Sequence, residues 1–419
     1  MSRVETISCG EELLDGRVQD TNGTYLAAHL AACGRRVARH TVVGDRAGEI
    51  AACACEALGR AGDVVLTGGL GPTDDDRTRK AAAEALGAPL ELREELLDRI
   101  AQRLGRPAAE LGERNRRQAL LPAGACAIEN PHGTAPGFCG EAGGGRLWCL
   151  PGVPGEMRPM FERDVLPSLA AGSARAPRAV SLHVTGLPES ECDRRVAEAL
   201  GAFGGVKHGI TVRFGVITVA LKAADAGAPL EAAAAAVREA LVEHVFGEGG
   251  ATLASAVVDE LAARSLTLAL AESCTGGLAS ARIVDVPGAS RVLLESVVAY
   301  ANEAKTRRLG VPAALIEVHG AVSEEVARAM AEGARASAGA DLAAAVTGIA
   351  GPRAGVAGPE GGTPAKPVGR VWLAIASARG TRALTRDLSG GREAVRERSV
   401  TFLLDLVRHE ALAFAEGKP

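Results

Sequence analysis

The sequence predicts an α/β protein made of two α/β sandwich domains that are joined by a small α+β module. Three observations lead to this fold class. The chain has 419 residues, strands alternate with helices over residues 1–172, and this alternation returns over residues 250–416 after a different pattern at 178–248. Hydrophobic residues make up 47% of the chain and charged residues 23%, so each domain can bury a core.

The first domain, residues 1–172, alternates strands and helices from its start. The predicted strands are Val4–Ser8, Arg36–Val43, Asp63–Thr67 and Arg146–Leu150, and the predicted helices are Thr21–Cys33, Ala47–Leu58 and Thr78–Leu86. Alternation of this kind predicts a parallel sheet with helices on both faces. The domain ends at AGSARAPRA, residues 171–179, whose composition is typical of a linker.

The middle module, residues 178–248, has a different pattern. It contains the strand-like segments SLHVTGL, ITVRF and VITVALKA and two predicted helices, Glu189–Leu200 and Leu230–His244. This mixture predicts a small α+β module that looks like a KH domain. The equivalent of a KH loop, Gly201-Ala202-Phe203-Gly204, lacks basic flanks, so no RNA or DNA binding is expected.

The third domain, residues 250–416, returns to the alternation of strand and helix. The predicted strands are residues 266–271, 296–300, 341–347 and 370–377, and the predicted helices are Leu253–Ala263, one after Cys274, Glu324–Ser337 and one from Gly391 to Ala415. The pattern predicts a second α/β layered structure, and no sequence repeat relates it to the first.

The composition and charge of the chain indicate which binding partners and which cellular compartment to expect. The net charge is −4 and no run of Lys or Arg occurs, which argues against a nucleic-acid partner. No apolar run is long enough for a membrane helix, and the first residues lack the pattern of a signal peptide. The nine cysteines form no CxxC pair, as is typical of reduced thiols. A cytoplasmic protein without nucleic-acid or membrane partners is expected.

Two Gly- and Asp-rich stretches mark the first domain. One is GEELLDG at residues 10–16, continuing to Asp20 and Asn22, and the other is TGGLGPTDDDRT at residues 67–78. A strand, a glycine turn and a helix start together expose backbone N–H groups and predict an anion site. A divalent cation shared with phosphate oxygens would explain the three aspartates. The alternative is that these aspartates only cap the helix at 78–86.

The segment of the third domain that is richest in candidate catalytic residues is AESCTGG, residues 271–277. Ser273 ends a predicted strand and precedes a helix, where α/β proteins place nucleophiles and where helix N–H groups can stabilise an oxyanion. The alternative is that Ser273 is a helix N-cap. Cys274 is the other candidate nucleophile, although nothing in the sequence marks a histidine partner for a thiolate.

A nucleophilic serine needs a base, and Lys305 is the candidate. A lysine serves as a base only where burial or a neighbouring cation lowers its pKa. The alternatives are that Lys305 is a solvated surface charge or that the base is His319. Tyr300 and Thr347 lie at strand ends, and Arg392 begins a helix, where its charge opposes the helix dipole and suggests a role toward an anion.

These motifs carry a family resemblance. GEELLDGRVQDTN, TGGLGPTDDDRT, NPHGTAPGF and LPGVPGEM resemble the N-terminal domain of the CinA family, the competence/damage-inducible proteins. AESCTGGLASARIVDVPGAS, VVAYANEAKTRRLGV, HGAVSEEVARAMAEGAR, AVTGIAGP, KPVGRVW and SGGREAVRERS resemble its C-terminal domain. Two departures are present: Ala301 replaces a serine often found after the tyrosine, and the loop 352–369 is long.

For the first domain, the resemblance implies a molybdopterin-binding-like fold. It also implies hydrolysis of ADP-ribose to AMP and ribose 5-phosphate, aided by a divalent metal (Mg, Mn or Co) and by K+. The implied phosphate- or substrate-binding residues are Asp20, Asn22, Gly69, Gly71 and Thr73, and the implied metal or water ligands are Asp75, Asp76 and Glu156.

For the third domain, the resemblance implies hydrolysis of nicotinamide mononucleotide (NMN) to nicotinate mononucleotide and ammonia, without a cofactor. Ser273 would be the nucleophile and Lys305 its base. The assisting or substrate-binding residues would be Tyr300, Thr347, Arg392, Thr275, Gly276 and Gly277. The resemblance also favours a homodimer. The alternatives are a molybdopterin- or nucleotide-binding module, or a competence-related accessory protein with one or both sites inactive.

Overall fold

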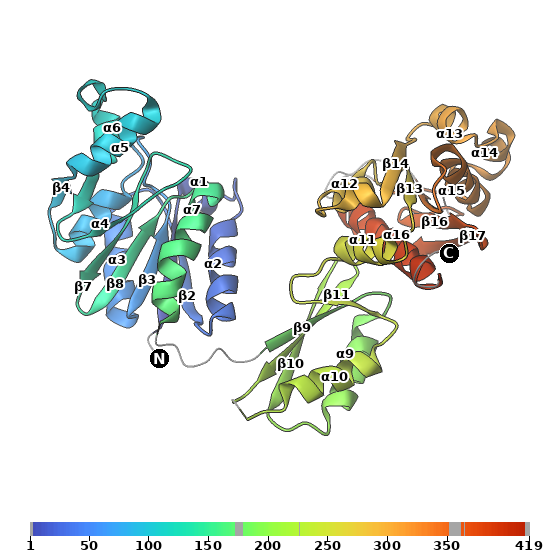
Figure 1. Cartoon of the computed structure of the whole chain (residues 1–419), viewed down its shortest axis with the longest axis horizontal. Coiled ribbons are helices and arrows are strands. Elements are labelled where there is room, and N and C mark those ends of the chain that lie inside the picture. The colour runs from blue at the N-terminus through green and yellow to red at the C-terminus, as the bar shows by residue number, and fades with distance from the viewer. Residues whose placement is uncertain (1–2, 172–178, 226, 352–361, 364, 415–419) are drawn as a thin grey trace. The chain divides into compact units, whose positions relative to one another are not determined.

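The structure is a computed structural model, and it describes residues 3–171, 179–225, 227–351, 362–363 and 365–414 (Figure 1). The chain divides into two compact units, residues 1–177 and 178–419. The predicted linker at 171–179 and the long loop at 352–369 fall largely outside the described residues. The mixed α/β fold class predicted from the sequence is confirmed.

The first unit is built on a six-stranded sheet in the order β2-β1-β3-β8-β7-β6. The strands are β1 Val4–Cys9, β2 Val37–Val43, β3 Asp63–Thr67, β6 Cys126–Ile128, β7 Gly137–Ala142 and β8 Gly145–Leu150. β2, β1, β3 and β8 run parallel, while β7 and β6 are antiparallel. The prediction of an all-parallel sheet is therefore wrong at this edge. Gly143 and Gly144, with φ of 61° and 79°, form a tight turn that can join only antiparallel strands.

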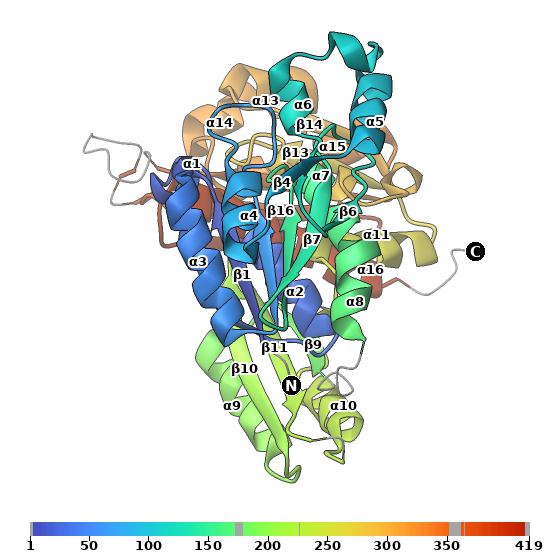
Figure 2. The same cartoon turned by 90° about the vertical axis from the view of Figure 1, so that its left-hand side faces the viewer.

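Helices cover both faces of this sheet, as predicted, because neighbouring strand residues point to opposite sides. Val64 and Leu66 pack on the face covered by α3, whereas Val65 packs on the face covered by α2 and α8. Figure 2 shows α3 and α8 on opposite sides of the strands. The helices are α1 Glu11–Leu14, α2 Thr21–Ala32, α3 Ala47–Arg60, α4 Thr78–Leu86, α5 Glu94–Leu104, α6 Glu113–Arg117, α7 Pro154–Met160 and α8 Leu166–Ala170. A small separate sheet pairs β4 Leu90–Leu92 with β5 Leu120–Pro122.

The second unit begins with the α+β module, whose antiparallel sheet has the order β10-β11-β9-β12. Its strands are β9 Ala179–Val184, β10 Val206–Arg213, β11 Val216–Ala223 and β12 Val245–Glu248, and its helices are α9 Glu189–Leu200 and α10 Leu230–Ala240. The predicted helix 230–244 ends four residues early. Residues 241–244 turn the chain back so that β12 can pair with β9.

The rest of this unit is a five-stranded sheet in the order β14-β13-β15-β16-β17. The strands are β13 Leu268–Glu272, β14 Leu293–Val298, β15 Leu342–Gly348, β16 Arg370–Ser377 and β17 Gly380–Asp387. β14, β13 and β15 run parallel, and β16 and β17 are antiparallel. The predicted strand 296–300 ends earlier, at Val298, so Tyr300 lies beyond its end. The sequence pattern did not identify β17.

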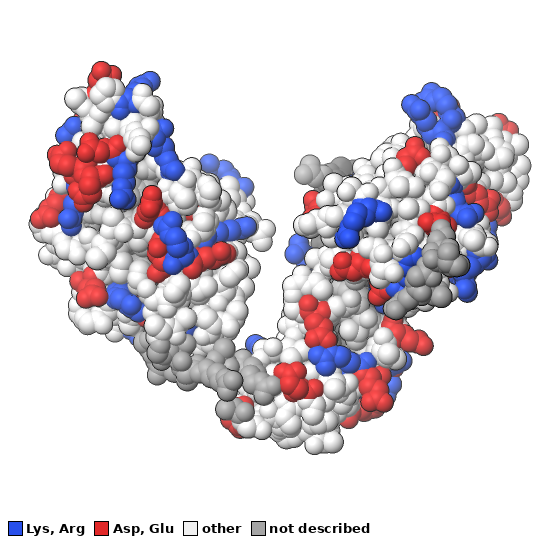
Figure 3. Space-filling view, viewed as in Figure 1, with Lys and Arg blue, Asp and Glu red and all other residues white. Residues whose placement is uncertain are grey.

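Two helical layers enclose this sheet. α11 Leu253–Ala263, α12 Leu278–Val284 and α16 Arg392–Leu412 pack on one face. α13 Asn302–Leu309, α14 Ala313–His319 and α15 Glu324–Ala338 pack on the other, against a layer of alanines from the strands. Acidic and basic side chains are interspersed on the visible face of both units (Figure 3). None of the described helices is long and apolar enough to cross a bilayer.

Candidate functional sites

The first unit has a cavity of about 500 Å³ where its parallel strands end. The segments after β1, β3 and β8 meet there with the start of α2, because the carboxyl ends of parallel strands share one edge of a sheet. This edge brings together most of the residues predicted for the first domain. Those that line the cavity are Asp20, Asn22, Gly69, Gly71, Asp75, Asp76 and Glu156. Thr73 lies just outside this lining.

The glycine turn at residues 68–71 is packed tightly against the start of α4. Gly69 has a φ of 65°, and a Cβ atom there would lie 2.4 Å from the hydroxyl of Thr78, so the position requires glycine. The Thr78 hydroxyl donates to the Gly68 carbonyl at 2.8 Å. Buried Arg79 donates to the Leu70 carbonyl at 2.6 Å, and burial lowers the pKa of Arg79 to about 10. The burial of Arg79 was not predicted from the sequence, because the residues Thr78-Arg79-Lys80 in a helix are typical of an exposed surface.

The three aspartates do not act as one group. Asp74 pairs with Arg114 at 3.1 Å and Arg117 at 2.9 Å on the surface. Asp76 accepts a hydrogen bond from the Thr73 N–H at 2.8 Å and another from its hydroxyl. The N-cap of α4 is Arg77, and no side chain caps it. The alternative reading of these aspartates as helix caps is therefore wrong.

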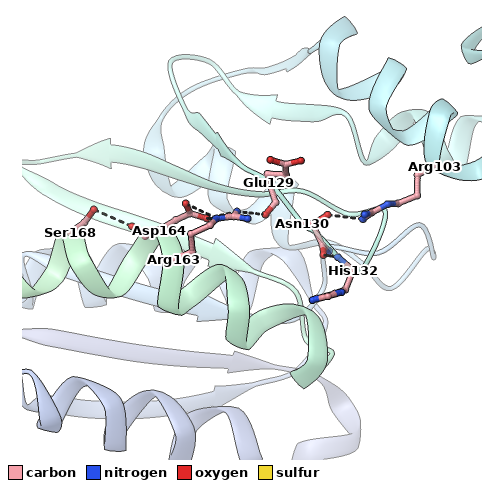
Figure 4. Close-up of polar contacts among 7 residues, drawn as sticks. All are labelled: Arg103, Glu129, Asn130, His132, Arg163, Asp164 and Ser168. Atoms are coloured by element: carbon pink, nitrogen blue, oxygen red, sulfur yellow. Dashed lines mark hydrogen bonds and ion pairs between the residues drawn. The ribbon is translucent and has the colours of Figure 1, made fainter.

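Asn130 organises the loop that faces this cavity, and Figure 4 shows it beside His132 and Arg103. Its Oδ1 accepts from the N–H groups of His132 at 3.0 Å and Gly133 at 2.8 Å, and its Nδ2 donates to Glu156 Oε2 at 2.6 Å. Arg103 holds the same loop by donating to three of its carbonyl groups, that of Asn130 at 2.6 Å. These contacts fix the orientation of the Glu156 carboxylate before any ligand binds.

Asp20 and Asn22 lie at the start of α2. Asp20 is its N-cap, accepting from the Gly23 N–H at 2.8 Å, and its other oxygen lies 2.8 Å from His40 Nε2. Asn22 is 8% exposed, and its Nδ2 donates to the Gly152 carbonyl at 2.7 Å. Its Oδ1 is buried without a partner among the described residues. Both side chains thus combine a structural role with a place in the cavity.

The acidic groups of this cavity offer only oxygen ligands, which suit a hard divalent cation. Among the described residues, however, no three His, Cys, Asp or Glu side chains converge on a common point. Burial, and then the charges of Glu12 and Asp75, raise the pKa of nearby Asp45. The oxygen ligands of this cavity are of the kind that fit a divalent cation shared with the phosphate oxygens of a ligand.

The second unit has a cavity of about 280 Å³ where β13 and β15 end. All five residues predicted as its catalytic group line it: Ser273, Tyr300, Lys305, Thr347 and Arg392. Cys274 and Asn302 also line it. Thr275, Gly276 and Gly277 do not, and Thr275 is fully buried behind the turn.

Lys305 is buried beside the end of β14. The residue is 1% exposed, and its Nζ donates to the Ala299 carbonyl at 3.0 Å and the Tyr300 carbonyl at 3.1 Å. No carboxylate pairs with it among the described residues. Burial lowers the pKa of Lys305, as a base requires. The alternative reading of Lys305 as a solvated surface charge is therefore wrong.

Ser273 directly follows β13 and is 7% exposed. α12 begins five residues later with Gly277 as its N-cap, so the reading of Ser273 as an N-cap is wrong. Within the described chain, no hydrogen bond joins its hydroxyl to Lys305, which is common before a substrate tightens the geometry. Burial raises the pKa of the Cys274 thiol to about 12, which makes a thiolate nucleophile unfavourable. His319 lies outside the cavity and pairs with Glu325.

Glu272, immediately before Ser273, was missed by sequence reasoning. Its carboxylate is fully buried and accepts from the N–H groups of Gly277 at 3.0 Å, Ala279 at 3.1 Å and Ser280 at 2.9 Å. It thereby occupies the N-terminus of α12, where an external anion would otherwise bind. The only signal in the sequence is a carboxylate ending the apolar strand LALAE.

The turn 273–277 is held from its other side as well. Arg396 on α16 donates to the Thr275 carbonyl at 2.7 Å, and the Gly276 N–H donates to the Ser273 carbonyl at 3.1 Å. Since Glu272 takes the Gly277 amide, the amides of Cys274 and Thr275 are the two in this turn that no carbonyl or carboxylate accepts in the described chain. Of these two residues only Cys274 lines the cavity, so its N–H is the donor in this turn that is available to an oxyanion there.

Tyr300 and Arg392 meet at the mouth of the cavity. Arg392, the first residue of α16, donates to the Tyr300 hydroxyl at 2.9 Å and to the Gly351 carbonyl at 2.9 Å. Tyr300 is 60% exposed. Thr347 lies deeper and donates to the Ala321 carbonyl at 2.9 Å. The lining of this cavity therefore combines a buried lysine and a serine hydroxyl with a guanidinium at its entrance.

The depth of Lys305 depends on close packing behind it. α13, which carries Lys305, ends at Leu309 against α15. A Cβ atom on Gly333 of α15 would lie 1.8 Å from the Leu309 carbonyl oxygen. The backbones of the two helices are therefore in direct contact at this point.

Together, the fold and the two cavities define a two-site α/β protein with a polar cavity at the carboxyl edge of each parallel sheet segment. Residues 5–171 match the family model described as a probable molybdopterin binding domain, and residues 250–411 match the CinA C-terminal domain. The chain belongs to the CinA family.

Relatives of this family cover nearly the whole chain. A CinA-like protein of Anaeromyxobacter dehalogenans is 43% identical over 412 residues, which span 97% of this chain and 99% of the relative. A CinA-like protein of Geobacter sulfurreducens is 45% identical over 418 residues, spanning 98% and 99%. A solved structure of the protein CinA from Thermoplasma acidophilum is 37% identical over 38% of this chain and 94% of its own, with a TM-score of 0.37.

Proposed function

We propose that the cavity of the second unit hydrolyses the carboxamide of NMN, giving nicotinate mononucleotide and ammonia. The observation that carries this proposal is Lys305, a buried lysine without a carboxylate partner that lines one small cavity together with Ser273. A neutral lysine can take the proton of a serine hydroxyl. Arg392 at the mouth provides a cation for the phosphate of a mononucleotide.

In the proposed reaction, Ser273 Oγ attacks the carboxamide carbon while Lys305 takes its proton. The N–H group of Cys274 stabilises the oxyanion. The C–N bond then breaks, and Lys305 gives the proton to the leaving ammonia. Water attacks the resulting ester, which restores Ser273 and releases nicotinate mononucleotide. Tyr300 and Arg392 bind the phosphate end of the substrate, and Thr347 lines the pocket beside the reacting group.

For the first unit, we propose hydrolysis of ADP-ribose to AMP and ribose 5-phosphate. The glycine turn and the start of α2 offer backbone N–H groups and the Asn22 amide to the diphosphate. Asp75, Asp76 and Glu156 would hold a divalent cation together with the phosphate oxygens, and such a cation supplies charge neutralisation and an activated water. The residues of the chain bind and orient the diphosphate, and Asn130 holds Glu156 in place.

One experiment on the full chain tests both assignments. Ammonia release from NMN and AMP release from ADP-ribose are measured with and without a chelator. Chelation should abolish AMP release and spare ammonia release, because only the first reaction depends on a cation. Ser273→Ala and Lys305→Ala should each lower ammonia release by at least about a thousandfold while AMP release stays unchanged. Substantial ammonia release by either folded variant would exclude the proposed amidase mechanism.

A further inference from the structure

The second unit contains another cavity, of about 560 Å³, which shares no lining residue with the amidase cavity. It lies where the tip of the β10–β11 hairpin approaches the start of α11, the end of α12 and the middle of α16. Its lining combines aliphatic and aromatic side chains with a few charged groups. Small-molecule sites have this composition and this size.

The hairpin tip carries a strained aromatic residue. The two central residues of its turn, Phe214 and Gly215, have φ of 49° and 87°. Positive φ at both positions is typical of a type I′ turn, which favours Asn-Gly. A bulky side chain in this conformation is an outlier that costs folding free energy. Such strain is retained where the side chain has a use.

Packing does not explain why Phe214 is present. Its side chain is half-buried, yet among the described residues it joins none of the five hydrophobic core clusters. It lines the cavity instead, and the guanidinium of Arg213 lies 5.5 Å from the centre of its ring. Gly215 lies beside α16, since a Cβ atom there would be in ordinary van der Waals contact with Thr401, at 3.5 Å.

The charged groups of the lining are two arginines, Arg213 and Arg282, and two carboxylates, Asp285 and Glu397. The features that suit a planar anion are the aromatic rings and the arginine that is unpaired among the described residues. The ring of Phe246 is stacked with that of His183 at a centroid distance of 5.9 Å and an interplanar angle of 23°. Aromatic faces of this kind bind flat heterocycles. Arg213 makes no ion pair with any described residue, so its charge is available to a phosphate. The remaining arginine of the lining, Arg282, is already paired with Glu397 at 2.9 Å.

We propose that this cavity binds a nucleotide, with its base against Phe214 and Phe246 and its phosphate at Arg213. The proposal does not depend on the amidase assignment. It explains why an aromatic residue is kept at a turn position where asparagine would fold better. It also separates this site from the first unit, where diphosphate binding relies on glycine amides.

The test is binding of AMP to the full chain by calorimetry, compared with the variant Phe214→Asn. Asparagine suits the turn, so the variant should melt a few degrees higher than the unsubstituted chain, yet bind AMP at this site at least about tenfold more weakly. Val212→Thr is the matched control, since Val212 is exposed on the same hairpin and does not line the cavity. It should bind AMP as the unsubstituted chain does.

A second arm locates the site. 8-Azido-AMP, activated by light, should label peptides that contain residues 211–218 or 246–254, and Phe214→Asn should remove this label while leaving any label in residues 1–171. Adenosine and ribose 5-phosphate should each compete poorly, because each lacks one half of the recognised chemistry. Labelling confined to the first unit, unchanged AMP binding in Phe214→Asn, or a lower melting temperature of that variant would overturn the proposal.

Discussion

The two cavities at the ends of the parallel strands differ in how complete they are before a ligand arrives. In the second unit, Ser273, Lys305 and Thr347 are all at least nine-tenths buried. In the first unit, Asp75 is exposed and Asp76 is half-buried, and no three potential metal ligands converge among the described residues. Both cavities nevertheless arise from the same device, a parallel strand followed by a glycine-containing turn.

This difference follows from the chemistry proposed for each cavity. A lysine is protonated in water, and only burial that exists in advance makes it a base. A site for a cation and a diphosphate can be completed by its substrate, which supplies charge and ligands of its own. We therefore expect substitutions that disturb the framework to harm the amidase more than the diphosphatase.

Among substitutions that disturb the framework of a cavity, the largest effect is expected for Glu272→Gln. The amide group cannot accept all the N–H donors that the carboxylate accepts, and unpaired buried donors cost about 1–3 kcal/mol each. Because the turn that carries Ser273 would shift, kcat for NMN should fall about 10- to 100-fold, with KM changed little. Steady-state kinetics on folded protein checks this.

Ser296→Ala is the control for that experiment. Among the described residues, the Ser296 hydroxyl hydrogen-bonds only to that of Ser280, one step further from the Glu272 carboxylate, so its variant should keep most of the proposed amidase rate. AMP release from ADP-ribose, measured in the same preparation, reports on the other unit. If Glu272→Gln is folded and retains kcat within a factor of about two, the turn does not need its carboxylate.

A smaller effect is expected for Asn130→Ala in the first unit. The substitution removes the hydrogen bond that orients Glu156 and the two that shape the loop. Since Arg103 still holds the loop carbonyls, kcat/KM for ADP-ribose should fall only about 5- to 20-fold. The amidase rate of the same chain is the internal control. A loss as large as that of Glu272→Gln would contradict the difference proposed between the two cavities.

The smallest effect concerns pH. Burial lowers the pKa of Lys305 below its ordinary value of 10.5. Between the lowered pKa and 10.5, the unfolded chain binds more protons at this residue than the folded chain, so stability rises with pH in that window. Lys305→Met should remove this contribution, which thermal melts of both proteins across the alkaline range would detect.

The same shift should govern the proposed amidase rate. In the proposed mechanism the neutral form of Lys305 is the base, so kcat/KM for NMN should rise with pH and level off above the lowered pKa. AMP release from ADP-ribose should not follow this profile. A flat amidase profile across the alkaline range would argue against Lys305 as the base.

The sequence predicted those helices and strands in which hydrophobic residues recur with a clear period. Ser273 and Thr347 were placed correctly because each ends an apolar strand, and Arg392 because it begins α16. The segment 87–145 lacks such a period, so its short strands and helices were not predicted. The strands β7 and β17 were also not predicted. The strand 370–377 was predicted and is β16, but its antiparallel direction was not, because strand direction depends on the length of each connection.

Burial of charged groups was beyond sequence reasoning. Arg79, Glu272 and Lys305 are each at least 95% buried, whereas their residue types are usually exposed. The groups that bury them could not be identified from neighbouring residues in the sequence. Arg79 contacts Pro136, and the N–H groups around Glu272 belong to the start of α12, whose first residue the sequence did not define. The role of Asn130 likewise depends on Glu156, which is 26 residues away.

The contact between Gly333 and Leu309 has a consequence for how the amidase cavity can change over time. Side chains in a core can be exchanged in compensating pairs, but a backbone oxygen has no smaller replacement. Because only a hydrogen atom fits between the Gly333 Cα atom and the Leu309 carbonyl oxygen, glycine at this position sets the distance between α13 and α15. Substitutions can alter the alanine layer around this contact. The depth at which Lys305 lies, however, depends on the absence of a Cβ atom at position 333.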